Sequence, residues 1–153
     1  MAPAQIILAL LRIGLGAIFV YAGALKIWDP QHFAIDVHHF QLTSWAVSVH
    51  VAVYLPWLEV LAGLALILRR LPLGALLAIA GMTLVFMVAL TSAWARGLDI
   101  SCGCFGKEEA KIATNFPELM LRDAALLAAA VILFAAESRR ARERIKADAQ
   151  RQP

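Results

Sequence analysis

Residues 71–94, LPLGALLAIAGMTLVFMVALTSAW, contain no charged side chain. At about 1.5 Å per residue, a helix of this length exceeds the roughly 30 Å hydrocarbon core of a bilayer. Pro72 suits the first turn of a helix, because the N–H that proline lacks would have no partner there. The stretch therefore predicts a transmembrane helix. Gly74 and Gly81, seven residues apart on one face of it, predict its packing surface.

Three more apolar runs occur in the chain, at about residues 5–25, 47–68 and 119–136. Hydrophobic residues make up 61% of the sequence and charged residues only 16%, which is too apolar for a soluble domain of this size. We therefore expect an all-α protein, a four-helix transmembrane bundle over residues 1–138, with a basic tail at 139–153. The formal net charge of +3 lies mostly in that tail and does not indicate nucleic acid. The composition indicates the lipid bilayer as a partner.

The positions of Lys and Arg predict how the bundle lies in the membrane. With four spans, both termini and the turn near residue 70 share one side. That side collects Arg69, Arg70, Arg139, Arg140, Arg142, Arg144, Lys146 and Arg151. The other side has only Lys26, Arg96, Lys107 and Lys111. Because cytoplasmic connections are enriched in basic residues, we expect a multi-pass protein of the bacterial inner membrane, with cytoplasmic termini and a periplasmic connection between the third and fourth spans.

The first span is followed by a short amphipathic segment. The span is expected to end before Pro30, which cannot continue the helix, with Lys26 at the level of the lipid headgroups. Phe33, Val37 and Phe40 then recur at helical spacing, which predicts a short helix lying on the membrane surface. This interfacial helix would lie on the periplasmic side, together with the connection after the third span.

The only two cysteines of the chain lie in that connection, in the stretch Ser101–Gly106, SCGCFG. Two extended residues span about 7 Å, whereas disulfide-bonded Cα atoms lie about 4.4–6.8 Å apart, so a Cys102–Cys104 bond requires the backbone to fold at Gly103. Glycine does this at little cost. The small ring would be strained, which favours passing the disulfide to another protein. An inert crosslink is a weaker explanation, because so short a loop gains little entropy from one.

A soft-metal site is the other possible use of this thiol pair. Two thiolates at this spacing supply half of a tetrahedral zinc or copper site, and His38 and His39 fall on the same predicted side of the membrane. No cysteine and histidine in the sequence have a spacing typical of metal ligands. We therefore expect no metal and treat a site of Cys102, Cys104, His38 and His39 as the alternative.

Charged residues inside the apolar runs are candidates for function, because ionisable groups are costly at membrane depth. Arg12 and Glu59 fall at compatible depths on consecutive spans, which predicts an ion pair between them. The alternative is that Glu59 transfers protons near a bound redox cofactor. Arg122 or Lys26 would stabilise a cysteine thiolate if it were turned toward the cysteine stretch.

Four segments of the chain have a distinctive order and spacing: Arg12–Gly16 with Ala22–Lys26 and Asp29-Pro30, then Leu58–Gly63, Ser101–Gly106 and Leu121–Asp123. Together they resemble the MauE/DoxX family of four-helix redox-associated membrane proteins. Asp123 departs from the family pattern, in which asparagine is expected after the arginine. Resemblance to the MauE branch implies a role in maturing the disulfide-rich small subunit of periplasmic methylamine dehydrogenase.

These observations predict a thiol–disulfide oxidoreductase. The Cys102–Cys104 disulfide would oxidise a periplasmic client protein or a thioredoxin-like carrier, and the resulting dithiol would pass electrons to a membrane quinone held between the helices. This arrangement resembles that of DsbB and the vitamin K epoxide reductase relatives, which differ in relaying electrons through a second cysteine pair. A non-enzymatic assembly factor for a periplasmic redox enzyme and a soft-metal binding protein are the alternatives.

Overall fold

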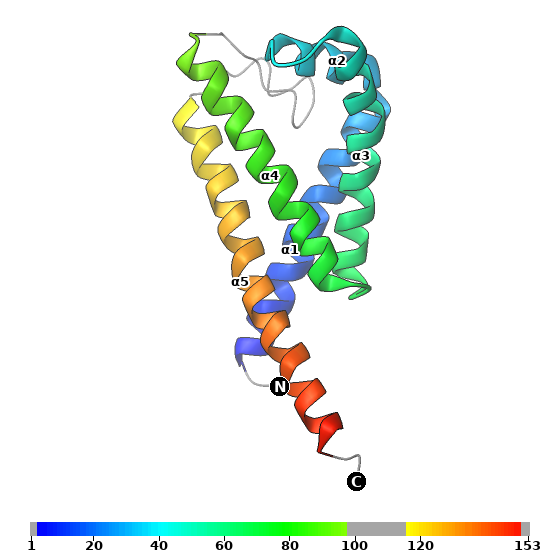
Figure 1. Ribbon diagram of the computed structural model, residues 1–153, viewed down its shortest axis with the longest axis vertical. Coiled ribbons are helices and arrows are strands. Elements are labelled where there is room, and N and C mark those ends of the chain that lie inside the picture. Colours follow the sequence, from blue (N-terminus) through cyan, green and yellow to red (C-terminus); the bar gives the residue numbers. More distant parts are fainter. Residues whose placement is uncertain (1–2, 98–115, 151–153) are drawn as a thin grey trace.

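The computed structural model describes residues 3–97 and 116–150, which form helices joined by short turns (Figure 1). The helices are α1 (Pro3–Trp28), α2 (Pro30–His39), α3 (Trp45–Ile67), α4 (Pro72–Ala95) and α5 (Phe116–Ala149). All but α2 are long and apolar enough to cross a membrane. The described ranges contain no strand. The predictions of an all-α fold with four spans, and of a short helix after the first span, are confirmed.

The bundle consists of two helix pairs. α1 packs mainly against α3, and α4 packs mainly against α5. α2 lies across one end of the bundle against α3, while both termini and the α3–α4 turn lie toward the other end (Figure 1). This arrangement agrees with the prediction that both termini and the turn near residue 70 share one side. The assignment of that side to the cytoplasm stays a prediction.

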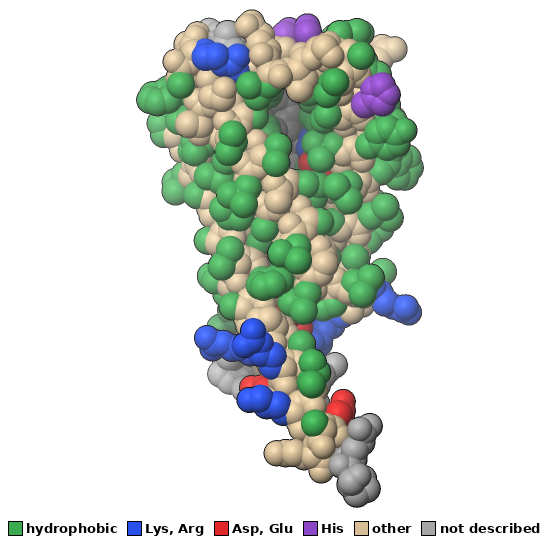
Figure 2. All heavy atoms as spheres, in the orientation of Figure 1, with side chains coloured by type: hydrophobic (Ala, Val, Ile, Leu, Met, Phe, Trp, Pro, Cys, Tyr) green, Lys and Arg blue, Asp and Glu red, His purple; other side chains and the backbone are tan. Residues whose placement is uncertain are grey.

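Buried apolar side chains form two groups along the bundle. The larger group joins all four spans, and its members are Leu15, Phe19, Ala62, Leu66, Ala75, Leu76, Ile79, Ala130 and Leu133. The smaller group lies beside α2 and consists of Phe40, Leu90, Ala93 and Leu119. Large hydrophobic side chains also cover the outside of the spans (Figure 2). Such a surface suits a bilayer, because lipid tails are as apolar as these side chains.

Glycines allow α1 and α3 to approach closely. A Cβ atom on Gly16 would lie 2.8 Å from the Gly63 carbonyl oxygen, and one on Gly63 would lie 2.6 Å from the Gly16 carbonyl oxygen. In contrast, a Cβ on Gly74 or Gly81 would meet no atom within 4 Å. The predicted packing surface of α4 is therefore wrong, because both glycines lie on its exposed side.

Hydrogen bonds fix α2 across the end of the bundle. Asp29 caps α2 by accepting a hydrogen bond from the backbone N–H of His32 at 3.2 Å, and Pro30 supplies a fixed φ in the first turn. Beyond the other end of α2, Arg96 donates to the backbone carbonyls of Phe40 and Gln41. This guanidinium therefore ties the end of α2 to the end of α4, where the cysteine-bearing connection begins.

The last helix extends well beyond its predicted span. The apolar run is predicted to end at residue 136 and the basic tail to follow as an exposed helix or as disordered chain, and α5 continues without interruption to Ala149. The tail contains mostly alanine, arginine, glutamate and lysine, which are good helix formers. The transmembrane part and most of the basic tail are therefore one continuous helix.

Candidate functional site

A buried ion pair joins α1 to α3. Lys26 Nζ lies 2.6 Å from Glu59 Oε1, and the two side chains are 7% and 9% exposed. Gly23, one turn before Lys26, lies against Pro56 and Glu59, so the close approach of the helices makes the contact possible. The Phe33 ring of α2 lies over the ammonium group, 5.1 Å from Nζ to the ring centroid. The Lys26 side chain is thus turned into the bundle, on the face of α1 that carries Gly23, and its predicted level at the headgroups stays a prediction.

A second pair of charges lies on α5. Arg122 donates from Nε to Asp123 Oδ1 at 3.2 Å, and the Asp123 side chain is only 5% exposed. Asp123 is also close enough to Lys26 for an electrostatic interaction. We call Lys26, Glu59, Arg122 and Asp123 together the charged site. Its two positive and two negative side chains are formally neutral as a group, which lowers the cost of burying each of them.

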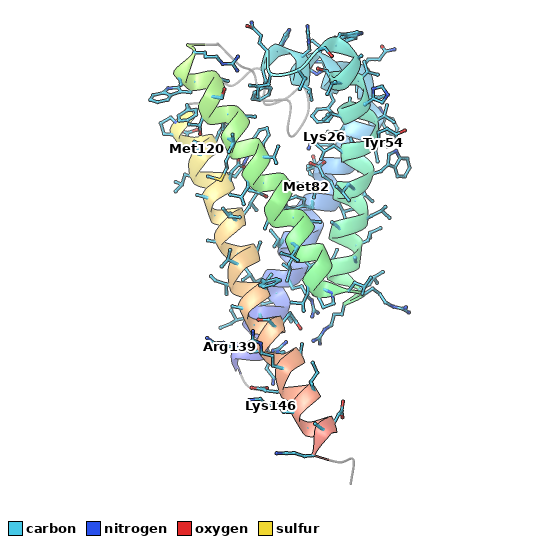
Figure 3. The ribbon with its side chains drawn as sticks, in the orientation of Figure 1. Lys26, Tyr54, Met82, Met120, Arg139 and Lys146 are labelled. Atoms are coloured by element: carbon cyan, nitrogen blue, oxygen red, sulfur yellow. The ribbon has the colours of Figure 1, made fainter. Side chains whose placement is uncertain are left out.

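A cavity of about 90 Å³ lies beside the charged site, between the two helix pairs. Its apolar wall includes Phe19, Phe33, Leu55, Met82 and Leu126, and so draws on all five helices. Figure 3 labels Lys26 of α1 and Met82 of α4, which face this space, and Figure 2 shows the surface hollowed between α3 and α4.

Two acceptor atoms of the charged site have no hydrogen-bond partner among the residues that the structure describes. They are Glu59 Oε2 and Asp123 Oδ2, and both are buried. Both residues line the cavity, which is roomy enough for a few water molecules at about 30 Å³ each. The site therefore offers two carboxylate oxygens to water or to a ligand that donates hydrogen bonds.

The cysteine-bearing connection begins and ends at neighbouring points of the bundle. Cys102, Gly103 and Cys104 themselves lie outside the described residues. On the flanks of the connection, the rings of Trp94 on α4 and Phe116 on α5 stack with their centroids 4.9 Å apart. From Phe116 to Arg122 is six residues, or about 9 Å along the helix. The charged site thus lies less than two turns from the point where the chain re-enters the bundle.

A family model described as methylamine utilisation protein MauE matches residues 4–136, which include all of α1 to α4 except the first residue of α1, and the apolar part of α5. This chain belongs to the MauE family. It is similar to the methylamine utilization protein MauE of Paracoccus denitrificans, at 35% identity over 96 residues, which are 62% of this chain and 52% of that protein. The aligned region thus spans about half the length of this relative. No solved structure matches the chain.

Membership of the MauE family and the four apolar helices make this a multi-pass membrane protein. The matched residues contain all four members of the charged site and the cysteine stretch. They exclude the basic tail at 139–153, which begins after the match ends. The charged site therefore belongs to the part of the chain that defines the family.

The predicted ion pair between Arg12 and Glu59 is wrong in this MauE-family protein. Glu59 pairs with Lys26, while Arg12 Nη1 lies 4.0 Å from Glu137 Oε1 near the other end of the bundle. The residue of α1 that faces Glu59 is Gly23, eleven positions or about 16 Å along the helix from Arg12. The glycine contacts determine which residues of α1 lie beside which residues of α3. This register cannot be obtained by counting residues from the ends of the predicted spans.

Of the five predicted supporting residues, the structure brings together Lys26, Glu59 and Arg122 and leaves Arg12 apart, while Gly103 lies outside the described residues. Asp123, which departs from the family pattern, is turned into the bundle, and its burial makes it a full member of the site. The sequence does contain a signal for this role: Asp123 is an acid beside an arginine at the start of an apolar run, where an unpaired charge is costly. Sequence reasoning does not identify Glu137, at the end of the same run, because its arginine partners Arg12 and Arg69 are distant in sequence.

The histidines proposed for a metal site lie on α2. His38 and His39 are exposed, and the His38 ring meets the Trp45 ring edge-on at 5.5 Å. Within residues 3–97 and 116–150, no three His, Cys, Asp or Glu side chains are grouped as a metal site requires. Because Cys102 and Cys104 are outside those ranges, the alternative of two thiolates with His38 and His39 stays untested.

Proposed function

We propose that this MauE-family protein is a membrane thiol–disulfide oxidoreductase that matures disulfides in an exported client. The observation that carries the proposal is that the only two cysteines, one glycine apart, belong to the connection whose ends meet near the charged site. The name of the Paracoccus denitrificans relative supports a place in methylamine utilisation. The client would be the small subunit of methylamine dehydrogenase, or a thioredoxin-like carrier serving it, on the periplasmic side of the bacterial inner membrane.

The proposed reaction has two steps that balance. A thiolate of the reduced client attacks the Cys102–Cys104 disulfide to form a mixed disulfide, and the second client thiol resolves it. The client thereby gains a disulfide, and Cys102 and Cys104 become thiols. Two electrons and two protons then leave these thiols and reduce one membrane quinone to the quinol, which restores the disulfide.

The charged site would assist this chemistry in two ways. Lys26 and Arg122 supply positive charge, which favours the thiolate form of a nearby cysteine. Glu59 Oε2 and Asp123 Oδ2, without partners in the described residues, are placed to accept protons directly or through water. These carboxylates would hold the protons while the electrons leave the thiols.

The size of the cavity limits where a quinone ring would bind. A cavity of about 150 Å³ admits benzene, and the space beside the charged site is about 90 Å³. The space is smaller than that cavity and is open on one side, so a quinone ring bound there would extend out of it. The ring would contact the open side of the cavity between α3 and α4, where the surface is hollowed (Figure 2).

Turnover by purified protein tests the proposal. Wild-type protein in lipid vesicles should oxidise a dithiol substrate with formation of one quinol per disulfide, and Cys102→Ser and Cys104→Ser should each abolish the reaction. Gly103→Val should slow it, because a β-branched residue resists the fold that ring closure requires. Quinol formation at the wild-type rate in both serine variants would disprove the proposal.

An assembly factor without turnover is the second candidate, and the presence of a single cysteine pair favours it. Without a second pair, the chain lacks the internal relay of two-pair oxidoreductases. Such a factor would bind the client and hold it for oxidation by another protein. A Cys102→Ser/Cys104→Ser double variant that still supports maturation of the client in cells would favour this function over the first.

A further inference from the structure

Near the end of the bundle opposite α2, three arginines from separate elements converge on one carboxylate oxygen. Glu137 Oε1 lies 3.4 Å from Arg140 Nη1, 3.6 Å from Arg69 Nη2 and 4.0 Å from Arg12 Nη1. Arg12 belongs to α1, Arg69 to the α3–α4 turn, and Arg140 and Glu137 to α5. We call these four residues the arginine cluster.

The charges of the arginine cluster do not balance. Three guanidinium groups face one carboxylate, which leaves an excess of two positive charges, and the Arg12 and Glu137 side chains are only 11% and 10% exposed. The charges that act on Arg12 are those of Arg69, Arg140 and Glu137, so the described residues provide only one neutralising charge. Each guanidinium has five N–H donors in a planar fork, far more than one carboxylate oxygen can accept. The cluster therefore has unused donors and favours a further anion.

The accessible donors lie where lipid headgroups are expected. The Arg69 and Arg140 side chains are 47% and 32% exposed, in contrast to that of Arg12. Arg69 has a positive φ of 58° in the short turn that follows the second span. Leu68 and Leu71 flank this turn and are 67% and 83% exposed. Exposed leucines thus flank the turn from which Arg69 reaches Glu137.

We propose that the arginine cluster binds the phosphate group of an anionic phospholipid, with an acyl chain against the exposed leucines of the α3–α4 turn. Guanidinium forks match phosphate oxygens in geometry and charge, and basic pockets between transmembrane helices are known sites for such headgroups. The phosphate would neutralise the excess positive charge and link α1, the α3–α4 turn and α5. Inorganic phosphate offers the same oxygens but no acyl chain.

Native mass spectrometry of protein exchanged from phosphatidylcholine into mixtures with phosphatidylglycerol tests the site. Arg69→Gln/Arg140→Gln should lose phosphatidylglycerol binding by about 30-fold or more, given roughly 1 kcal/mol for each arginine. The matched control is Arg139→Gln/Arg142→Gln, which removes the same charge from exposed positions of α5. The control should keep binding to within about 3-fold, since these arginines are outside the cluster.

Each other result contradicts the proposal in part or in whole. If both double variants lost phosphatidylglycerol binding equally, the binding would be a non-specific attraction between the basic end of the protein and an anionic membrane, and the proposed site would be wrong. Binding of inorganic phosphate, with no preference for phosphatidylglycerol over phosphatidylcholine, would disprove the lipid assignment. If the cluster variant does not fold, Arg69→Gln alone, at an exposed turn position, should still weaken phosphatidylglycerol binding about 5-fold, and unchanged binding would disprove the site.

Discussion

At the scale of single residues, the Lys26 and Glu59 pair shows how a charge is tolerated inside a membrane bundle. Both side chains are buried, and each is the nearest opposite charge of the other. Removing one partner leaves an uncompensated charge, whereas removing both removes the cost of burying either. The pair is therefore a stringent test of whether the site is structural, catalytic or both.

We expect Glu59→Gln to lower the free energy of unfolding by about 3–5 kcal/mol, because Lys26 then stays buried without its carboxylate. Lys26→Met/Glu59→Leu should recover much of the loss, and denaturation in detergent measures both variants. If Glu59→Gln keeps wild-type stability but has no turnover, then Asp123 pairs with Lys26 in the variant. Glu59 would then act in the reaction and would not be needed for the fold.

The carboxyl of Asp36 on α2 predicts a dependence of stability on pH. Burial raises its pKa above the usual 3.8, and the nearby His32, 3.1 Å away through Nδ1, partly opposes this. A raised pKa means that the folded state favours the protonated acid. The resulting stabilisation is fully present below the ordinary pKa and is lost as pH rises through the raised value.

Asp36→Asn should therefore gain in melting temperature relative to wild type as pH is raised from below 3.8 through that range. Thermal melts of both proteins at several pH values measure the difference. A difference that stays constant with pH would mean that Asp36 keeps its ordinary pKa in the folded protein.

At the scale of elements, the contact of α1 with α3 depends on glycine, whereas the exposed side of α4 does not. A Cβ on Gly63 would lie 2.6 Å from a backbone carbonyl oxygen, which cannot move without moving α1. We expect Gly63→Ala to destabilise the protein by about 1–3 kcal/mol through this overpacking. Gly81→Ala is the matched control in α4 and should be neutral or stabilising by up to about 1 kcal/mol. Equal effects in the two variants, measured by thermal unfolding, would rule out the close approach.

The elements themselves could be predicted from the sequence, but the contacts between them could not. Residues 71–94 have no charge and so had to be a span, and Pro30 marked the end of the first one. The partner of Glu59 depends on which residue of α1 faces it. The apolar pattern of α1 is compatible with several registers against α3, and each register would place a different residue opposite Glu59. Gly16, Gly23 and Gly63 decide that register, yet a glycine in a helix looks the same whether it packs, as Gly63 does, or faces outward, as Gly81 does.

At the scale of the whole molecule, the two ends of the bundle differ in chemistry. One end gathers the arginine cluster and the basic part of α5, and the other has α2, the charged site nearby and the start of the cysteine-bearing connection (Figure 1). Because basic connections are retained in the cytoplasm, this polarity favours a periplasmic position for the cysteines. The proposed oxidation of an exported client requires that position, since disulfides persist outside the cytoplasm.

A membrane-impermeant thiol reagent decides this orientation. After mild reduction of intact cells whose outer membrane has been made permeable, the reagent should label Cys102 or Cys104 in the wild-type protein. The matched control replaces both cysteines by serine and adds Ala147→Cys, at an exposed position near the end of α5. Because that position lies beyond the basic end of the bundle, it should be labelled only after lysis. The reverse pattern would place the cysteines in the cytoplasm, where reducing systems keep thiols reduced, and would end the proposal that they donate a disulfide to an exported protein.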